Sequence, residues 1–351
     1  MTEIRRSDHS WEEEGAHRVA PDVYRIPLPL PGDALRAVNV YLVVGDKRAT
    51  MIDGGQQIVA ARKVLEKSLA SVGVGIGDIS EFLVTHIHRD HYTQASAIRE
   101  EYGTKVNLGE LELPSFRVIQ SDAFASHQRQ ENELIKAGAK ELLEKLGDEG
   151  PLDEEMRTWY RDPDRWLTDL EVVDAGNRRL KVLSTPGHTR GHVVYYDEAA
   201  NVVFAGDHVL PHITPSIGLE SARPEFPLRD YLASLKRVRM LPDAKVLPAH
   251  GPVVDSLHHR VDELVAHHDN RLSEAAQAVA HGHHTAYEVA NYLRWTSRGR
   301  QFSELDPFNQ VMAVMESKYH LDLLCLQGVL RSGLEGEIEV YALVASPADP
   351  S

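Results

Sequence analysis

Three histidines and one aspartate lie close together in the stretch Thr85-His86-Ile87-His88-Arg89-Asp90-His91. Imidazole nitrogens and carboxylate oxygens are ligands that zinc, iron and manganese accept, and burying this much polarity without a cation would leave it unsatisfied. The alternative is a chance cluster of surface histidines, which the 19 histidines among 351 residues make worth weighing. Because further His and Asp motifs follow, we predict a metal site.

Three later motifs each come directly after a strand-like stretch. They are Thr185-Pro-Gly-His188-Thr-Arg-Gly-His192, Gly206-Asp207-His208 and Pro248-Ala249-His250-Gly251-Pro252. A loop just beyond a strand is held by the rigid sheet while its donor atom faces a cleft. Any one of these histidines alone would be ascribed to a turn, but the recurrence indicates one distributed site. Asp53, which ends another strand-like stretch, is either part of it or a simple turn or helix cap.

The elements that must position these motifs begin with β-type runs. The runs Val23–Ile26 and Val38–Val44 predict paired strands, and Arg48–Gly55 and Ile79–Thr85 predict two more. The spacing of apolar residues predicts helices at Val59–Val72 and Thr93–Tyr102, the second with Thr93 as its N-cap. We also expect strands at Leu170–Asp174, Leu180–Ser184, Val193–Asp197, Val202–Ala205 and Lys245–Leu247.

The segment of about 110–170 differs in character, because it is dense in Glu, Lys, Arg and Gln with Leu and Ala at helical spacing. It predicts an inserted helical hairpin, with helices near Glu131–Leu146 and Asp153–Tyr160, that could form a lid or substrate wall. Its aromatic residues either contact substrate or bury the hairpin against the sheet, and packing is the favoured interpretation for each one. They are Phe116, Phe124, Trp159, Tyr160 and Trp166.

The predicted domain organisation has three parts: a flexible N-terminus at 1–18, a catalytic domain at 19–256 and a small helical domain at 257–351. In the last part we expect helices at Leu257–Ala280, Ala286–Trp295 and Phe308–Tyr319, followed by the apolar run Leu321–Leu330.

Composition narrows the classes of function. The formal net charge is −15, and residues 260–351 hold 7 Lys and Arg against 13 Asp and Glu, which argues against a nucleic-acid binder. Arg294, Arg298 and Arg300 form a small basic exception, which we interpret as a solvated turn. With Cys325 as the one cysteine, no internal disulfide can form. We see no signal peptide or membrane span and expect a cytoplasmic protein, with a homodimer as a further expectation.

With these motifs the sequence resembles the metallo-β-lactamase superfamily, whose signature is HxHxDH followed by a His, an Asp and a final His. The similarity covers about residues 20–255 and is closest to glyoxalase II-like and LACTB-like hydrolases, some with a winged-helix-like tail. It implies an α+β fold, an αββα sandwich. It also implies two divalent metal ions, with zinc expected first and iron or manganese as alternatives.

Position by position, the resemblance implies one ion held by His86, His88 and His188. The second ion would be held by Asp90, His91 and His250, with Asp207 bridging the two. Asp53 and His192 would support these ligands. The first motif alone would also fit a single zinc ion.

Two neighbouring divalent ions can lower the pKa of a shared water and polarise the oxygen under attack. We therefore expect a hydrolase, with Asp90 and Asp207 as its catalytic carboxylates, acting on a small acyl compound. Thioesters of glutathione, coenzyme A or a carrier protein come first, and lactones or other esters next. The alternatives are an endoribonuclease acting on single-stranded RNA and a ligand-binding or regulatory protein without turnover.

Overall fold

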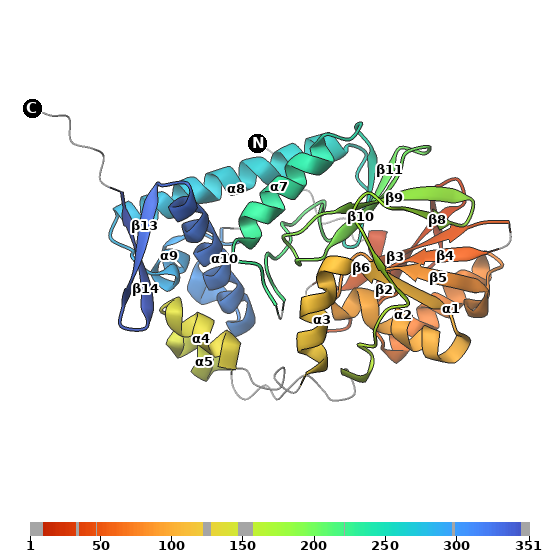
Figure 1. Cartoon of the computed structure of the whole chain (residues 1–351), viewed down its shortest axis with the longest axis horizontal. Helices are drawn as coiled ribbons and strands as arrows, with labels where there is room; N and C mark the ends of the chain where they lie inside the picture. Colours follow the sequence, from red (N-terminus) through yellow and green to blue (C-terminus); the bar gives the residue numbers. More distant parts are fainter. Residues whose placement is uncertain are drawn as a thin grey trace, which may run out of the picture.

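Two facing sheets form the larger part of the computed structural model, which describes residues 10–32, 35–46, 48–121, 128–146, 157–220, 222–296 and 299–344 (Figure 1). One sheet has seven strands in chain order: β1 His17–Ala20, β2 Val23–Pro29, β3 Ala37–Val44, β4 Ala49–Ile52, β5 Ile79–Leu83, β6 Lys105–Gly109 and β7 Arg165–Leu167. The other has the order β12 Lys245–Pro248, β11 Val202–Gly206, β10 Val193–Asp197, β9 Arg178–Ser184 and β8 Val172–Ala175. The predicted strands are confirmed.

Strand β3 shows why the sheets lie inside the molecule. Its alternate side chains point to opposite faces, as in any strand. Val38, Val40 and Leu42 pack in the core shared with helices, whereas Tyr41 and Val43 pack in the core between the two sheets. A strand that is buried on both faces explains the nearly unbroken apolar run in this part of the sequence.

Helices cover the outer face of each sheet and complete the predicted αββα sandwich. Helices α1 Val59–Ser71, α2 Arg89–Tyr102 and α3 Leu113–Gln120 contribute to the core of the seven-stranded sheet. Helices α7 Pro227–Arg239 and α8 Leu257–Ala280 cover the five-stranded sheet. Short 3₁₀ turns lie at Ser10–Glu12, Ile76–Asp78, Glu110–Glu112 and Phe302–Glu304.

Helix α2 begins at Arg89, so the prediction that Thr93 caps it was wrong. The N-cap position is taken by His88, and the Thr93 hydroxyl lies inside the helix, where it donates to the Arg89 carbonyl at 2.6 Å. Asp90 therefore lies in the first helical turn, where the positive end of the helix dipole favours a carboxylate.

The described part of the region between α3 and β7 contains the short helices α4 Gln128–Lys136 and α5 Lys140–Leu146, instead of one helix at 131–146. The chain breaks at Gly138, whose φ of 78° lies in the left-handed region. Leu134 and Leu142 are buried in the same core as the C-terminal helices. Figure 1 shows α4 and α5 beside α10 Pro307–Leu326. Phe124 and the first half of the predicted helix at 153–160 lie outside the described residues.

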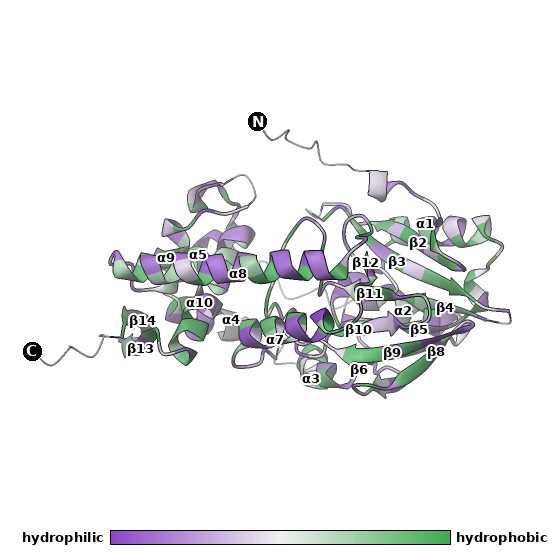
Figure 2. Ribbon diagram, turned by 90° about the horizontal axis from the view of Figure 1, so that it is seen from above, coloured by the Kyte–Doolittle hydropathy of each residue, from purple (hydrophilic) through white to green (hydrophobic). Residues whose placement is uncertain are grey.

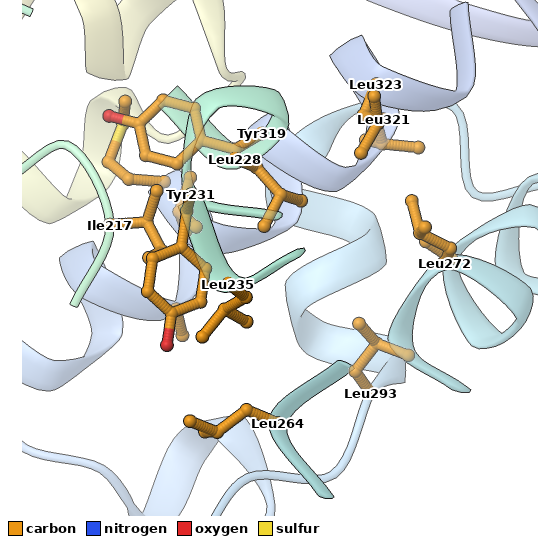
Figure 3. Close-up of a cluster of buried hydrophobic side chains, with 14 of the residues drawn as sticks. Ile217, Leu228, Tyr231, Leu235, Leu264, Leu272, Leu293, Tyr319, Leu321 and Leu323 are labelled. Atoms are coloured by element: carbon orange, nitrogen blue, oxygen red, sulfur yellow. The ribbon is translucent and has the colours of Figure 1, made fainter. Parts of the chain in front are cut away.

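The C-terminal part contains α9 Ala286–Tyr292, α10 Pro307–Leu326 and a hairpin of β13 Leu330–Glu335 and β14 Ile338–Leu343. Helix α10 continues through Leu321, so the prediction that this helix ends at Tyr319 was wrong. The amphipathic helix α8 runs from the sandwich to these elements (Figure 2). Ile217, Tyr231 and Tyr319 join the two parts in one apolar core (Figure 3). No helix in the described ranges is both long and apolar enough to span a bilayer.

Candidate metal centre

All seven predicted ligands converge at one edge of the two sheets. They come from the loop after β5, the first turn of α2 and the loops that follow β9, β11 and β12. The residues are His86, His88, Asp90, His91, His188, Asp207 and His250, and the structure groups them as His86/His88/His188, His86/His91/Asp207 and Asp90/His91/His250.

The first group consists of three imidazoles, which we call the three-histidine group. The His86 Nε2 atom lies 3.0 Å from His88 Nδ1 and 3.2 Å from His188 Nε2, and the His188 and His88 nitrogens are 3.0 Å apart. Tetrahedral ligands about 2.0–2.1 Å from a zinc ion lie about 3.4 Å from one another. The spacing of these nitrogens therefore fits ligands of one ion.

The second group, which we call the mixed group, consists of Asp90, His91 and His250. The Asp90 Oδ2 atom lies 3.5 Å from His91 Nε2 and 3.4 Å from His250 Nε2. Asp207 lies between the groups, with Oδ1 3.4 Å from His250 Nε2 and Oδ2 3.4 Å from His188 Nε2. His91 Nε2, His250 Nε2 and Asp207 Oδ1 are buried without a hydrogen-bond partner. Because buried polar atoms normally have partners, these residues fit a site built for cations.

Oxygen acceptors on the outer side of the rings fix the orientation of four imidazoles. His91 Nδ1 pairs with Asp53 at 2.9 Å, and His250 Nδ1 donates to the Ala37 carbonyl at 2.8 Å. The carbonyls of Ser216 and Leu219 accept from His188 Nδ1 at 2.6 Å and His88 Nε2 at 2.7 Å. Such bonds leave the inner nitrogen of each ring free to bind a cation.

Asp53 and His192 lie where the resemblance implied, directly behind the ligands. Asp53 has a φ of 61°, and its carboxylate accepts from the Thr85 amide at 2.7 Å as well as from His91. His192 stacks on the His86 ring, and its Nε2 accepts from the Asp207 amide at 3.1 Å. Backbone in the left-handed region costs free energy for a non-glycine residue and is concentrated at functional sites.

The two groups differ in their electrostatics. Burial lowers the pKa of His86 and His88, and burial together with His88 lowers that of His188 to about 4, so the three-histidine group is neutral. In the mixed group burial acts in the same direction on His91, but Asp90, Asp53 and Asp207 outweigh it and raise its pKa to about 9. Burial would raise the pKa of Asp207, yet His250 and His91 hold it well below its usual range. A metal ion bound to the mixed group would take the place of the proton that His91 holds without it.

Two supporting residues, Asn39 and Glu112, were not foreseen from the sequence. The Asn39 amide donates to the carbonyls of Pro248 and Gly251 at 3.0 and 2.8 Å, so it clamps both sides of the His250 loop. Glu112 is fully buried beside the loops that carry His86, His88 and His188. Neither residue belongs to a motif, and no sequence signal marks them.

Other candidate residues lie apart from the ligands or serve in packing. Phe116, Tyr160 and Trp166 form an aromatic cluster with Tyr92 of α2, as the packing interpretation predicted. Arg294 and Arg300 are exposed, and Arg298 lies outside the described residues.

Comparison with known proteins gives consistent matches. A family model described as "Metallo-beta-lactamase superfamily" matches residues 33–250. The chain is 27% identical over 327 residues to the Bacillus subtilis (strain 168) protein "Probable metallo-hydrolase YqjP", covering 90% of this chain and 96% of the relative. It is 22% identical over 254 residues to the Aspergillus fumigatus "Atrochrysone carboxyl ACP thioesterase", covering 72% of this chain and 47% of the relative.

A solved structure extends the similarity to the C-terminal part. The Thermus thermophilus "metallo-beta-lactamase family protein TTHA1429" superimposes with a TM-score of 0.78 and 28% sequence identity. The match covers 93% of this chain and 100% of the other, so it extends well beyond the sandwich.

Proposed function

This chain belongs to the metallo-beta-lactamase superfamily, and from that premise we propose that it is a metal-dependent hydrolase of small acyl compounds. The first substrates to test are thioesters of coenzyme A, glutathione or a carrier protein, followed by lactones and other esters. The observation that carries the proposal is the position of Asp207 between two ligand groups, where its Oδ1 atom and the Nε2 atoms of His91 and His250 are buried without hydrogen-bond partners.

The residues of the site have two proposed roles, binding metal ions and orienting water. His86, His88 and His188 would hold one divalent ion, and Asp90, His91 and His250 the other, with zinc as the first candidate. Ions bound there activate water and polarise an acyl oxygen. Asp207 Oδ1 and Asp90 Oδ2 face the same space, where they would orient the attacking water and accept its proton.

The thioester class is supported by the similarity to the Aspergillus fumigatus protein, whose name describes it as an acyl-carrier-protein thioesterase. The same metal ligands could activate water for attack on an acyl carbon or on a phosphorus atom, so the ligands alone do not distinguish an acyl substrate from a phosphodiester. The C-terminal hairpin of β13 and β14 resembles the wing of a winged helix and favours RNA as the second candidate, whereas the acidic charge of residues 260–351 opposes it.

Metal analysis combined with a substrate panel tests the proposal. We expect two divalent ions per chain and hydrolysis of at least one thioester, with loss of one ion in His88→Ala and loss of activity in Asp207→Ala. His259→Ala is the matched control, because this histidine on α8 is 76% exposed and lies outside the ligand groups. A chain that holds two metals but hydrolyses no thioester, lactone or ester would overturn the proposal, and cleavage of single-stranded RNA at low salt would replace it.

A further inference from the structure

Glu112 is a buried acid at the back of the three-histidine group. It ends the 3₁₀ turn Glu110–Glu112, and none of its surface is exposed. Its Oε1 atom accepts from the Thr189 hydroxyl at 2.5 Å and from the Ile87 amide at 3.3 Å. Ile87 lies between His86 and His88, and Thr189 follows His188, so one carboxyl oxygen ties together the two loops that supply the group.

The backbone of the loop that follows His188 packs directly against the turn that carries Glu112. Gly191 approaches the 3₁₀ turn so closely that a Cβ atom would lie 2.1 Å from the Glu112 amide nitrogen. Only glycine allows such an approach. The distance between the His188 loop and the turn that carries Glu112 is therefore set by direct backbone packing.

A second buried acid, Glu220, lies close enough to Glu112 for the two carboxyls to repel each other. Glu112 Oε2 and Glu220 Oε1 are both buried without hydrogen-bond partners, and Ser115 donates to the other oxygen of Glu220 at 2.6 Å. Burial and repulsion from Glu220 raise the pKa of Glu112, and burial raises the pKa of Glu220. The nearby positive charge of Arg190 opposes both shifts.

Glu220 belongs to the segment that orients two of the ligands. The carbonyls of Ser216 and Leu219, a few residues before it, accept from His188 and His88. Glu112 is thus linked to the three-histidine group directly, through Ile87 and Thr189, and its carboxyl also interacts electrostatically with the residue that follows Leu219 in this segment.

We propose that Glu112 is a positioning residue of the three-histidine group, because one of its carboxyl oxygens joins the two loops that supply His86, His88 and His188. The inference rests on the proposed function, since it concerns how one ion is held. A glutamine at this position would keep the hydrogen bonds from the Thr189 hydroxyl and the Ile87 amide. An alanine would remove both.

Metal affinity tests this role without reference to turnover. In Glu112→Ala we expect about 10- to 100-fold weaker binding of one zinc ion in competition with a chelator, as is typical when a group behind a ligand is removed. The second ion should bind as in the wild type. Glu112→Gln should stay within about threefold of the wild type, and Glu110→Ala, a change at an exposed acid on the same turn, should have no effect.

Double variants show which of the two bound ions is affected by the loss of Glu112. In a His250→Ala background the remaining ion occupies the three-histidine group, and adding Glu112→Ala should weaken it. In a His188→Ala background the same addition should leave the remaining ion unchanged. Thr189→Val removes one hydrogen bond at constant shape, so it provides the same test if Glu112→Ala does not fold.

The outcomes separate the two proposals. Two ions bound with wild-type affinity in Glu112→Ala, or equal weakening of both ions, would overturn the positioning role alone. A wild-type chain that binds no divalent ion would overturn the proposed function and this inference with it.

Discussion

Four imidazoles in the site have one ring nitrogen paired with an oxygen acceptor and the other turned toward the shared space. His88 presents Nδ1 to that space, whereas His86 and His188 present Nε2. The choice follows from the acceptor that each ring meets, because the nitrogen that donates to an oxygen cannot also bind a cation. The supporting atoms therefore determine the site as much as the ligands do.

Replacing Asp53 by asparagine tests this dependence. The amide would keep an acceptor for Thr85 but present a donor to His91 Nδ1, so His91 would lose its orienting partner. Asparagine tolerates the φ of 61°, and the fold should persist. We expect about 10- to 100-fold weaker binding of the ion in the mixed group, measured by chelator competition. Asp22→Asn, an exposed aspartate with a φ of 55°, is the control, and equal affinity in both variants would contradict the prediction.

The buried acids predict a pH dependence of stability. Because folding raises the pKa of Glu112, the folded state holds its proton more tightly than the unfolded state. Stability contributed by the protonated acid is present below the ordinary pKa of glutamate, about 4.3, and is lost as the pH rises toward the raised value. Glu112→Gln should therefore be more stable than the wild type at about pH 9 but not at about pH 4.5, as measured by urea unfolding of the metal-free chain. Glu110→Gln should show no such gain.

Ligand residues were predictable at this scale, whereas the residues behind them were not. His86 to His91 form a contiguous motif, and the later ligands recur at strand ends. Glu112 and Asn39 are single polar residues in segments without a motif, and they meet the ligands only after the sheets have formed. Backbone carbonyls such as that of Ser216 leave no trace in a sequence.

Among the elements, the loops that follow the strands depend on close backbone approach. Gly206, at the end of β11 and just before Asp207, has a φ of 50°. A Cβ atom there would lie 2.7 Å from His192 Nε2 and from Thr85 Oγ1. The loop is therefore packed directly against the residues that support the ligands.

Gly206→Ala should destabilise the fold more than an alanine at an uncrowded glycine. Gly328 also has a positive φ, 74°, but no atom lies within 4 Å of the position that a Cβ would take there, so it isolates the backbone cost of about 1–2 kcal/mol. Crowding should add about 1–3 kcal/mol for Gly206→Ala. Unfolding in urea measures both variants, and equal losses would show that the loop yields to the extra atom.

Helix and strand types were predicted better than their ends. The start of α2 was missed because Arg89 to Tyr92 carries ligands, which hides the helical pattern in this turn. The hairpin at Leu330–Leu343 was missed because Leu321–Leu330 was taken as one apolar run, although Gln327 and Gly328 end α10 before the first strand begins. Both errors concern the end of an element, where the pattern of apolar residues does not mark the boundary.

For the whole molecule, the insertion and the C-terminal part share one core. Leu134, Ala139 and Leu142 pack in the same cluster as residues of α9 and α10. The Tyr287 amide of α9 donates to the Ala137 carbonyl at 3.0 Å. The insertion therefore depends on the C-terminal helices for its apolar contacts, although it precedes them by a long stretch of chain. The domain boundary at residue 256 stays a prediction.

Leu142→Ala should loosen both regions together. This side chain is fully buried, and its truncation should cost about 2–5 kcal/mol. We expect faster amide hydrogen exchange in α9 and α10 as well as in α5, with the strands of the sandwich unchanged. Leu334→Ala, at a leucine that is 69% exposed, should change stability by less than about 0.5 kcal/mol. Faster exchange confined to α5 would show that the two regions open separately.

The shared core also has a consequence for the order of synthesis. Helices α4 and α5 leave the ribosome early, but their buried partners in residues 286–326 are made only after the whole sandwich. Until then, Leu134 and Leu142 are left facing water, and such transiently exposed apolar surface favours aggregation. Chains that stop before α10 should therefore aggregate through the insertion even when the sandwich has folded.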